Sequence, residues 1–481
     1  MLTVNLAPVL PEIALLCGAC VILIVDLFLP EAKRHVSFWL TQVVLVVAAA
    51  GVYAPTQMQP ATAFSGMVVD DMLSDTLKLM ACASLSLTLF YSRGYCAARG
   101  LFRGETFVLS LFALLGMMVM IAAGSFVTLY LGLELLALSL YAMVAMHRAS
   151  NAASEAAMKY FVLGALASGM LLYGMSMLYG ATGSLGIAEV ARALAAGTGN
   201  KTILLFGLVF VVSGVAFKLG AVPYHMWVPD VYDGAPTAVT LLIGTAPKLA
   251  AYAFMLRLLG VALGSLWFDW QGMLVVLALL SMVLGNVVAI AQTNIKRMLA
   301  YSSIANMGFM LMGFLAANPT GYSAAMFYAV AYVLTSLASF GMIMLLSREG
   351  FEADRLDDFR GLNQRSPWWA FMMLLVMFSL AGVPPTVGFY AKFSVIQAAV
   401  DAGFVWLAVV AVMASLVGAF YYLRVVKLMY FDDATDMTPI AARGDNRALL
   451  SANGLALLGF GILPQPLLGL CVVALAHSGL L

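Results

Sequence analysis

The sequence predicts an all-helical, polytopic membrane protein with about fourteen transmembrane helices, arranged around two inverted five-helix repeats. Hydrophobic residues make up 63% of the 481 positions and charged residues only 10%, a composition that soluble globular domains do not have. Apolar runs long enough to cross about 30 Å of hydrocarbon as a helix follow one another along nearly the whole chain. Three of these runs contain glycine and proline beside a lysine, and this pattern predicts helices that are broken within the membrane.

About fourteen segments of the chain are candidates for membrane-spanning helices. The connections between them are too short to form a soluble domain, so the whole fold is expected to depend on the bilayer. The predicted spans cover residues 9–29, 36–54, 74–92, 105–122, 125–146, 156–180, 202–222, 237–259, 271–292, 299–317, 323–346, 367–400, 403–430 and 449–475.

The seventh, eighth and twelfth spans carry helix-breaking residues. Their interruptions lie at residues 217–223, 244–248 and 382–392. Proline lacks a backbone N–H and clashes with the preceding turn, whereas glycine tolerates the dihedral angles of an unwound segment. Unwound backbone at membrane depth survives only where it is surrounded by protein or lines a water-filled cavity. We therefore expect helices 7, 8 and 12 to be discontinuous and to line such a cavity.

The spacing of these breaks predicts an internal repeat, because helices 7 and 12 are five helices apart. A repeat with an odd number of helices inverts its second copy in the membrane, as in many transporters. The predicted division of the chain is an N-terminal three-helix segment (1–104), a first repeat of helices 4–8 (105–259), a second repeat of helices 9–13 (271–430), and a C-terminal loop with helix 14 (431–481).

Basic residues are concentrated in the loops after odd-numbered spans, whereas the loops after even-numbered spans contain little beyond Arg192 and Lys201. This asymmetry marks the cytoplasmic side. With an even number of spans, both termini are then expected on the non-cytoplasmic side. The basic residues of the odd-numbered loops are Lys33, Arg34, Arg93, Arg99, Arg103, Arg148, Lys296, Arg297, Arg348, Arg355, Arg360, Arg365, Arg443 and Arg447.

Four charged residues lie inside the apolar stretches: Glu134, Lys218, Lys248 and Lys392. A charge at the centre of a membrane helix costs roughly 2.5–3.5 kcal/mol on insertion scales, so such residues usually face a protein or water interior and have a function. Removal from water disfavours the charged form of a lysine and a nearby carboxylate favours it, so a buried lysine can load and release a proton. We expect these four residues to form an ion path through the membrane.

Glu134 lies among leucines without an aqueous face, and we expect it to pair with Lys218 so that changes in their separation alter the lysine's affinity for protons. The same two residues would also suit a static ion pair that holds two helices together. That alternative fits Lys248 and Lys392 less well, because neither has a carboxylate nearby in the sequence.

Other kinds of site are not indicated. No basic run suggests nucleic acid, and the sequence contains no glycine-rich nucleotide-binding motif, HExxH or paired CxxC arrangement, so this chain is expected to carry no cofactor and no metal. The charged residues near span ends are expected to extend their long side chains to the membrane interface; they are Lys159, Arg257, Arg424 and Lys427.

The segment FKLGAVPYHMWVPDVYDGAPTAVTLLIGTAPK at residues 217–248 resembles the signature of the antiporter-like membrane subunits of bacterial proton-pumping NADH:quinone oxidoreductase (respiratory complex I). Further matches to this family lie at residues 155–165, 294–305 and 382–393. These motifs are long and nearly continuous, so the resemblance covers most of the chain.

The resemblance implies inverted five-helix repeats, broken seventh and twelfth helices, and a central axis of charged residues. By its motif, Glu134 is similar to the family's fifth-helix glutamate, and Lys218, Lys248 and Lys392 are similar to the lysines of helices 7, 8 and 12. One position departs from the pattern: the family commonly has a histidine after the letters SSIA, and this chain has Asn306. An amide cannot bind and release a proton near neutral pH, so we expect a water molecule to bridge there.

The resemblance also implies a mechanism. A proton from the cytoplasmic side would reach Lys248, pass to or from Lys392 and leave on the opposite side, while Glu134 and Lys218 switch the proton affinity. The energy would come from NADH oxidation by quinone in partner subunits, which would hold the FMN and iron–sulfur clusters. The implied partners are the other membrane subunits of complex I, including neighbouring antiporter-like subunits, in the bilayer of a bacterial inner membrane.

Three alternatives remain open at this point. A subunit of a multi-subunit sodium/proton antiporter or of a membrane-bound hydrogenase would share the fold, although the letters PDVYDGAPT favour complex I. A membrane scaffold would anchor partners without an ion path of its own. A quinone site has the least support, because His225 and Trp227 are the only suitable head-group ligands and are expected to be packing residues.

Overall fold

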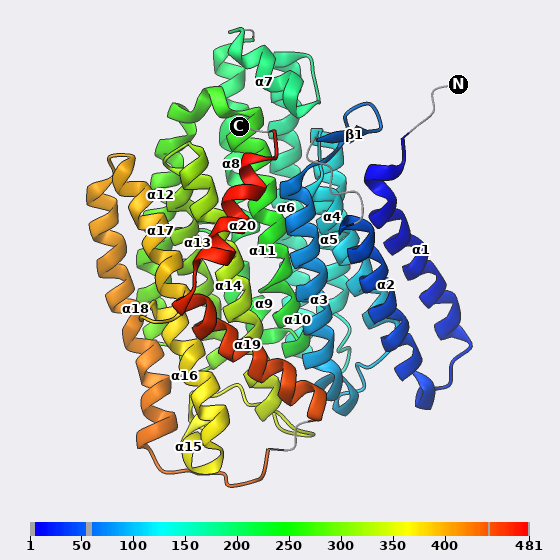
Figure 1. The fold of residues 1–481 in the computed structure, drawn as a ribbon, viewed down its shortest axis with the longest axis vertical. Coiled ribbons are helices and arrows are strands. Elements are labelled where there is room, and N and C mark those ends of the chain that lie inside the picture. The colour runs from blue at the N-terminus through cyan, green and yellow to red at the C-terminus, as the bar shows by residue number, and fades with distance from the viewer. Residues whose placement is uncertain (1–4, 54–59, 198, 441–442, 480–481) are drawn as a thin grey trace.

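The chain folds into a bundle of long helices that run roughly parallel to one axis (Figure 1). The computed structural model describes residues 5–53, 60–197, 199–440 and 443–479. Eleven of its helices are long and apolar enough to cross a membrane, and a twelfth is added if the bent pair at the C-terminal end counts as one span. Helix α13 and the pair α16 and α17 occupy the two remaining predicted spans, so all the predicted membrane segments are helical.

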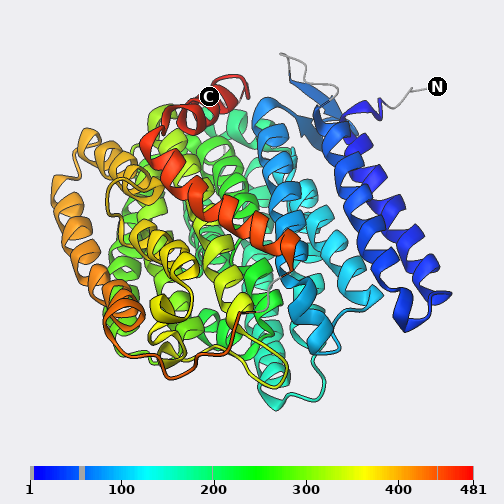
Figure 2. The same cartoon turned by 60° about the horizontal axis from the view of Figure 1, so that its bottom comes forward.

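The N-terminal segment forms one edge of the bundle (Figures 1 and 2). Two largely exposed helices pair with each other, and the third packs against the rest of the protein. A two-stranded hairpin precedes the third helix and was not predicted. These elements are α1 (Leu10–Leu27), α2 (His35–Tyr53), β1 (Ala61–Ala63), β2 (Val68–Asp70) and α3 (Met72–Ala98).

The next helices correspond to predicted spans 4 to 8. Helices α4 and α5 approach closely because Gly116 and Gly132 face each other's backbones, a device typical of membrane helix contacts. The elements are α4 (Gly104–Ile121), α5 (Phe126–Val144), α6 (Asn151–Thr182), α7 (Ile187–Ala195), α8 (Lys201–Leu219), α9 (Trp227–Gly234), α10 (Thr237–Ile243), α11 (Ala246–Met255) and a π-helical turn (Leu256–Ala262).

The following helices correspond to predicted spans 9 to 13. Their packing repeats that of the preceding group: α12 with α13 matches α4 with α5, and α14 with α16 and α17 matches α6 with α8 and α9. Helix α14 is buried along most of its length and forms the centre of this half. The elements are α12 (Trp267–Ile290), α13 (Ile295–Phe314), α14 (Pro319–Leu346), α15 (Leu362–Arg365), α16 (Pro367–Ala381), α17 (Val387–Asp401) and α18 (Val405–Phe431).

All three predicted helix breaks are present. Helix 7 is divided into α8 and α9, helix 8 into α10 and α11, and helix 12 into α16 and α17. Gly220 and Gly382 end α8 and α16 with φ angles of 75° and 83°, a left-handed conformation that glycine adopts without strain. The sequence pattern therefore located the unwound segments correctly.

The last span is bent, which was not predicted. Helix α19 (Gly444–Ile462) and helix α20 (Gln465–Ala476) meet at 80°. Helix α19 runs obliquely across the bundle and contacts α3, α14, α16 and α17 (Figure 2). Because α3 belongs to the N-terminal segment and α16 to the second half, α19 ties distant parts of the chain together.

Candidate functional site: buried lysines at two helix breaks

The break in helix 7 is held by side chains from α9, α11 and α12. The Trp227 indole N–H donates to the Phe217 carbonyl oxygen at 3.0 Å, and the Val222 amide donates to the Ser281 hydroxyl at 2.9 Å. Lys248 donates from Nζ to the Leu219 carbonyl oxygen at 3.0 Å. These bonds satisfy backbone groups that the break would otherwise leave without partners.

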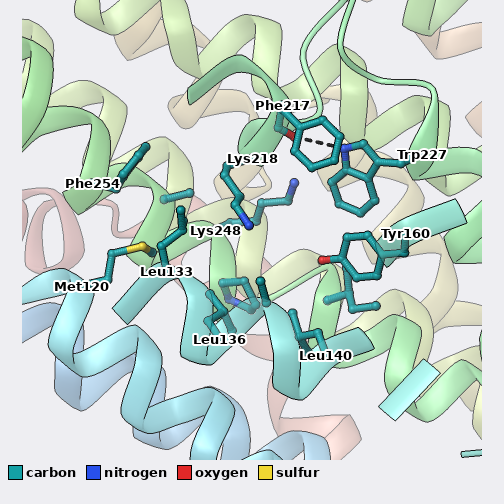
Figure 3. Close-up of a pocket in the computed structure, with 14 residues that line it drawn as sticks. Met120, Leu133, Leu136, Leu140, Tyr160, Phe217, Lys218, Trp227, Lys248 and Phe254 are labelled. Carbon is teal, nitrogen blue, oxygen red and sulfur yellow. Dashed lines mark hydrogen bonds between the residues drawn. The ribbon is translucent and has the colours of Figure 1, made fainter. Parts of the chain in front are cut away.

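A small cavity lies beside this break. Its volume is ≈ 30 Å³, and both Lys218 and Lys248 line it together with Tyr160 and Trp227. The two lysines extend toward the same space, while Leu133 and Leu136 of α5 form the opposite wall (Figure 3). The volume is enough for about two water molecules. The described residues form no salt bridge with Lys218, whose side chain lines this cavity.

Glu134 acts on Lys218 without contacting it directly. One carboxylate oxygen is buried and has no hydrogen-bond partner among the described residues, and no salt bridge to Lys218 is formed there. Its charge is nevertheless close enough to act on Lys218. The expected direct pair is therefore not found in this conformation, and the two groups interact only through space.

The break in helix 12 has the same organisation as the break in helix 7. Lys392 donates from Nζ to the carbonyl oxygens of Leu380 and Ala381, each at 2.9 Å, and to the Ser415 hydroxyl at 3.0 Å. The ammonium also lies 4.9 Å from the centre of the Phe309 ring, a favourable cation–π distance. No carboxylate pairs with this lysine in the described part of the chain.

Asn306 forms part of a hydroxyl network next to Lys392. Its amide nitrogen donates to the Ser302 carbonyl oxygen at 2.8 Å, and its oxygen accepts from the Tyr328 hydroxyl at 2.7 Å. A cavity of ≈ 10 Å³ is lined by Asn306, Tyr328, Tyr332 and Lys392. That volume is close to the minimum for one water molecule, so the geometry is compatible with the water bridge expected at this position.

Lys248 and Lys392 share one electrostatic feature, which is contact with the C-terminal end of a half-helix. Lys248 binds one carbonyl oxygen at the end of α8, and Lys392 binds two at the end of α16. The C-terminal end of a helix carries partial negative charge and attracts cations. This arrangement stabilises an ammonium group in the membrane without neutralising it by a carboxylate.

The structure corrects the expectation for Arg257. This residue does not reach the membrane interface, because it is only 1% exposed and forms a salt bridge to Asp71 at 3.1 Å. Its Nε also donates to the Ile121 carbonyl oxygen at 2.6 Å. A second buried pair joins Lys78 to Glu12 at 2.7 Å. The Arg257–Asp71 pair attaches the N-terminal segment to the end of helix 8, whereas the Lys78–Glu12 pair joins α3 to α1 within that segment. The sequence analysis missed both pairs because their members are far apart in the chain.

The other charged residues near span ends have defined partners. Lys159 pairs with Asp230 at 2.9 Å, and Lys427 pairs with Asp432 at 3.5 Å. Arg424 donates to the Gln292 carbonyl oxygen at 2.6 Å and so caps the end of α12. These contacts give each of the three a structural role near a helix end.

Of the two candidate quinone ligands, Trp227 is a packing residue, whereas the buried Nδ1 of His225 has no hydrogen-bond partner among the described residues. Trp227 is 3% exposed and stacks on Tyr160 with ring centres 4.7 Å apart. It supports the helix 7 break rather than presenting a free polar group. Among the described residues, no three side chains of the kinds that bind metal ions come together.

Comparison with known proteins places this architecture in a family. The family described as "NADH:quinone oxidoreductase/Mrp antiporter, TM" matches residues 123–418. NADH-quinone oxidoreductase subunit N of Thiobacillus denitrificans is 61% identical over 472 residues, which is 98% of each chain. The chain therefore belongs to the antiporter-like membrane proteins of this family. Within it, the chain is a member of the NADH-quinone oxidoreductase subunit N group.

Two solved structures show the same fold. A chain of respiratory complex I from Thermus thermophilus with bound aureothin is 32% identical, with a TM-score of 0.81 and coverage of 96% of this chain and 99% of that chain. A chain of the Mrp complex from Dietzia sp. is 23% identical, with a TM-score of 0.84 and coverage of 99% and 98%. The second likeness concerns the fold alone.

Proposed function

We propose that this chain translocates protons as a membrane subunit of NADH:quinone oxidoreductase, along an axis formed by Glu134, Lys218, Lys248 and Lys392. The observation that carries the proposal is the shared environment of Lys248 and Lys392, each held by carbonyl oxygens at a helix break. Small cavities adjoin both lysines, so water can bring protons to them and take protons away.

The redox chemistry is assigned to partner subunits. NADH oxidation, FMN, the iron–sulfur clusters and quinone reduction belong to them, and this chain contributes the proton path that their reaction drives. Coupling to this chain would act on the charge balance of its four axis residues, because none of them forms a salt bridge in the described chain, unlike the buried pairs Arg257–Asp71 and Lys78–Glu12.

The position of Glu134 on α5 is an argument that another membrane subunit binds this helix. It lies on the same face of α5 as Val127, Leu131 and Leu138, which are 42%, 60% and 54% exposed. Lipid hydrocarbon on this face would leave a carboxylate without a polar partner at membrane depth, which is costly. A second membrane subunit could cover α5 and place a polar or basic group beside Glu134. The carboxylate would then have a partner, and the energetic cost of leaving it in hydrocarbon would be avoided.

The topology that goes with this function has both termini on the non-cytoplasmic side of a bacterial inner membrane. The start of α1 and the end of α20 lie on one side of the bundle, and α15 lies on the other (Figure 1). The positive-inside distribution makes the α15 side cytoplasmic. We also propose that residues 105–259 and 271–430 are the two inverted repeats, since their helices pack in matching pairs.

The proposal is tested with Lys248→Ala in the native complex. Proton pumping and NADH:quinone activity are measured side by side in membranes, with the amount of assembled complex as the reference. Loss of both activities at normal assembly supports a coupled path through Lys248. Normal pumping at normal assembly would leave the charged axis as structure and favour a scaffold.

A further inference from the structure

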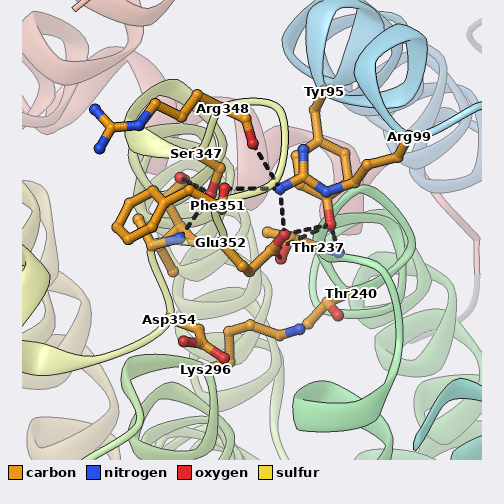
Figure 4. A network of polar contacts seen from close by, with 12 residues as sticks. Tyr95, Arg99, Thr237, Thr240, Lys296, Ser347, Arg348, Phe351, Glu352 and Asp354 are labelled. Atoms are coloured by element: carbon orange, nitrogen blue, oxygen red, sulfur yellow. Dashed lines mark hydrogen bonds and ion pairs between the residues drawn. The ribbon is translucent and has the colours of Figure 1, made fainter. Parts of the chain in front are cut away.

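The two ends of α14 are closed differently. At its C-terminal end, Glu352 of the following loop pairs with Arg99 at 2.6 Å and accepts from the Thr237 hydroxyl at the start of α10 (Figure 4). In the same region, Lys296 lies in the first turn of α13 and not in the predicted loop, is only 4% exposed and donates to the Ala235 carbonyl oxygen at 2.8 Å. Polar contacts therefore fill this end of the bundle, whereas the N-terminal end of α14 borders an open groove.

This groove lies between α14, α17 and α20, which pack against α14 on the side of the bundle where the chain ends (Figure 1). Its volume is ≈ 490 Å³, which is within the range of sites that bind small molecules. The walls are largely apolar, and two of the side chains that form them, Phe393 and Val472, are 55% and 47% exposed. An apolar surface of this kind in a membrane protein is a place for another apolar molecule.

The groove has the depth of one lipid leaflet. It follows α17 from its last residue, Asp401, inward to Tyr390. These eleven steps along the helix rise about 16 Å, which is half of the hydrocarbon thickness of about 30 Å. Helix α20 starts at its 80° bend with α19 and ends on the side of the chain termini, so Pro464 and Gln465 line the inner end of the groove. An acyl chain from the leaflet on that side fits this depth, whereas a helix that crosses the whole membrane does not.

The outer end of the groove carries polar groups of two kinds. The Asp401 carboxylate is exposed and accepts from the Gln397 amide nitrogen at 2.8 Å. Because Asp401 ends α17, the partial negative charge of the helix end adds to the charge of the carboxylate and favours a cation. Thr320 lies on the other wall, in the first turn of α14, where the helix end is partially positive and a hydroxyl can donate to an anion. The two walls together suit a headgroup that carries both charges.

We propose that this groove binds a zwitterionic phospholipid with an ammonium headgroup, such as phosphatidylethanolamine. One acyl chain lies along α14, α17 and α20, the ammonium group pairs with Asp401, and the phosphate lies at the start of α14. Phosphatidylglycerol would fit less well, because it offers Asp401 no cation and its negative charge is repelled there. The lipid packs against the half-helix that carries Lys392, but its binding does not depend on the role of that lysine in proton transfer.

The test uses the assembled complex in lipid nanodiscs that contain phosphatidylethanolamine with a photoreactive group in its acyl chain. After illumination, the labelled peptides are identified by mass spectrometry. We expect labels in residues 319–327, 390–401 and 464–476, which form the three walls of the groove.

Ser394→Phe fills the groove in this experiment. Ser394 lines it and bonds its own helix at the Tyr390 carbonyl oxygen, so the larger side chain replaces lipid rather than an interhelical hydrogen bond. The matched control is Val473→Phe, because Val473 is a 41% exposed residue of α20 that does not line the groove. At equal complex abundance, we expect the labels to be lost in Ser394→Phe and kept in Val473→Phe.

The headgroup is tested by competition with unlabelled lipids. Phosphatidylethanolamine should displace the probe from the wild type about two- to fivefold better than phosphatidylglycerol, which is the range expected for an exposed ion pair. Asp401→Asn should abolish this difference. Asp269→Asn is the control and should keep it, because Asp269 lies in the first turn of α12, outside the groove.

Three results would overturn the proposal. Absence of labels from the three walls in the wild type would mean that lipid does not enter the groove, as when a neighbouring subunit covers it. Equal labelling of Ser394→Phe and the wild type would mean that the probe only touches the outer surface. Equal competition by the two headgroups in the wild type would reject the ammonium site, and this comparison also decides if Ser394→Phe fails to assemble. None of these readouts measures proton pumping, so their failure leaves the proposed function standing.

Discussion

The ammonium group of Lys248 caps a broken helix: it donates to the carbonyl oxygen of Leu219, the last residue of α8, across 3.0 Å. Lys392 binds the carbonyl oxygens at the end of α16 in the same manner. Each lysine thus supplies the hydrogen bonds that the break removes, and each break supplies the partial negative charge that a buried ammonium needs. The two features depend on each other, which explains why glycine, proline and lysine occur together in the sequence.

Lys248→Met should destabilise the protein more than Lys248→Arg. Methionine leaves the Leu219 carbonyl oxygen buried without a donor, which costs about 1–3 kcal/mol, whereas arginine keeps a donor for it. The measurement is the thermal inactivation of the purified complex carrying each variant. Equal inactivation temperatures for the two variants would show that the lysine does not cap α8.

Asp71→Leu should reduce assembly strongly, because it leaves Arg257 charged and buried without its partner. Removing one member of a buried pair costs about 3–5 kcal/mol. The double variant Asp71→Leu with Arg257→Met removes both charges and should recover much of the loss. The amount of assembled complex in membranes reports both effects. A double variant as deficient as the single one would contradict a pairwise interaction.

Gly132→Val should separate α4 from α5. A Cβ atom at this position would lie 2.6 Å from the Met120 amide nitrogen and 2.8 Å from the Gly116 carbonyl oxygen, which is shorter than packed atoms allow. Gly272→Val is the matched control, since a Cβ atom there meets nothing within 4 Å. We expect complex abundance to fall for the first variant only. Equal abundance of the two would mean that the helices can move apart without cost.

Asp354 should make stability depend on pH. Its pKa is raised from the ordinary value of 3.8, chiefly by burial, so the folded state holds this proton more tightly than the unfolded state. The stabilisation is complete below the ordinary pKa and is lost as the pH rises through the raised one. Asp354→Asn stays neutral, so its thermal stability should fall less between about pH 4 and pH 7. An unchanged pH dependence would contradict this assignment.

The features that the sequence predicted well are those with a local cause. Gly220 and Gly382 end their helices because glycine accepts the left-handed conformation, and that property can be read from the residue itself. Glu134, Lys218, Lys248 and Lys392 stood out for a local reason too, because charge is rare in apolar segments. Their part in proton transfer stays a prediction. The contacts of Lys248 and Lys392 with carbonyl oxygens were not predictable, because the sequence does not tell which backbone groups a distant side chain meets.

Two mispredictions have different causes. Arg257 was assigned to the interface from its position in the span, but its partner Asp71 lies 186 positions away and no local pattern connects them. Lys296 was assigned to a loop because basic residues are common there. In that case a signal existed: Asn294 is a good N-cap residue and its side chain accepts from the Lys296 amide. Reading that cap would have placed Lys296 inside the helix.

The most direct test of the account is the number of protons pumped per NADH oxidised by the complex with Lys392→Arg, purified and reconstituted in liposomes. Arginine keeps the charge and can donate to the carbonyl oxygens at the end of α16, but it does not release a proton at physiological pH. The account predicts a complex that assembles normally and pumps fewer protons per NADH, or turns over more slowly, than the wild type. Wild-type pumping and turnover would contradict it, because a group that cannot give up a proton would then suffice at this position.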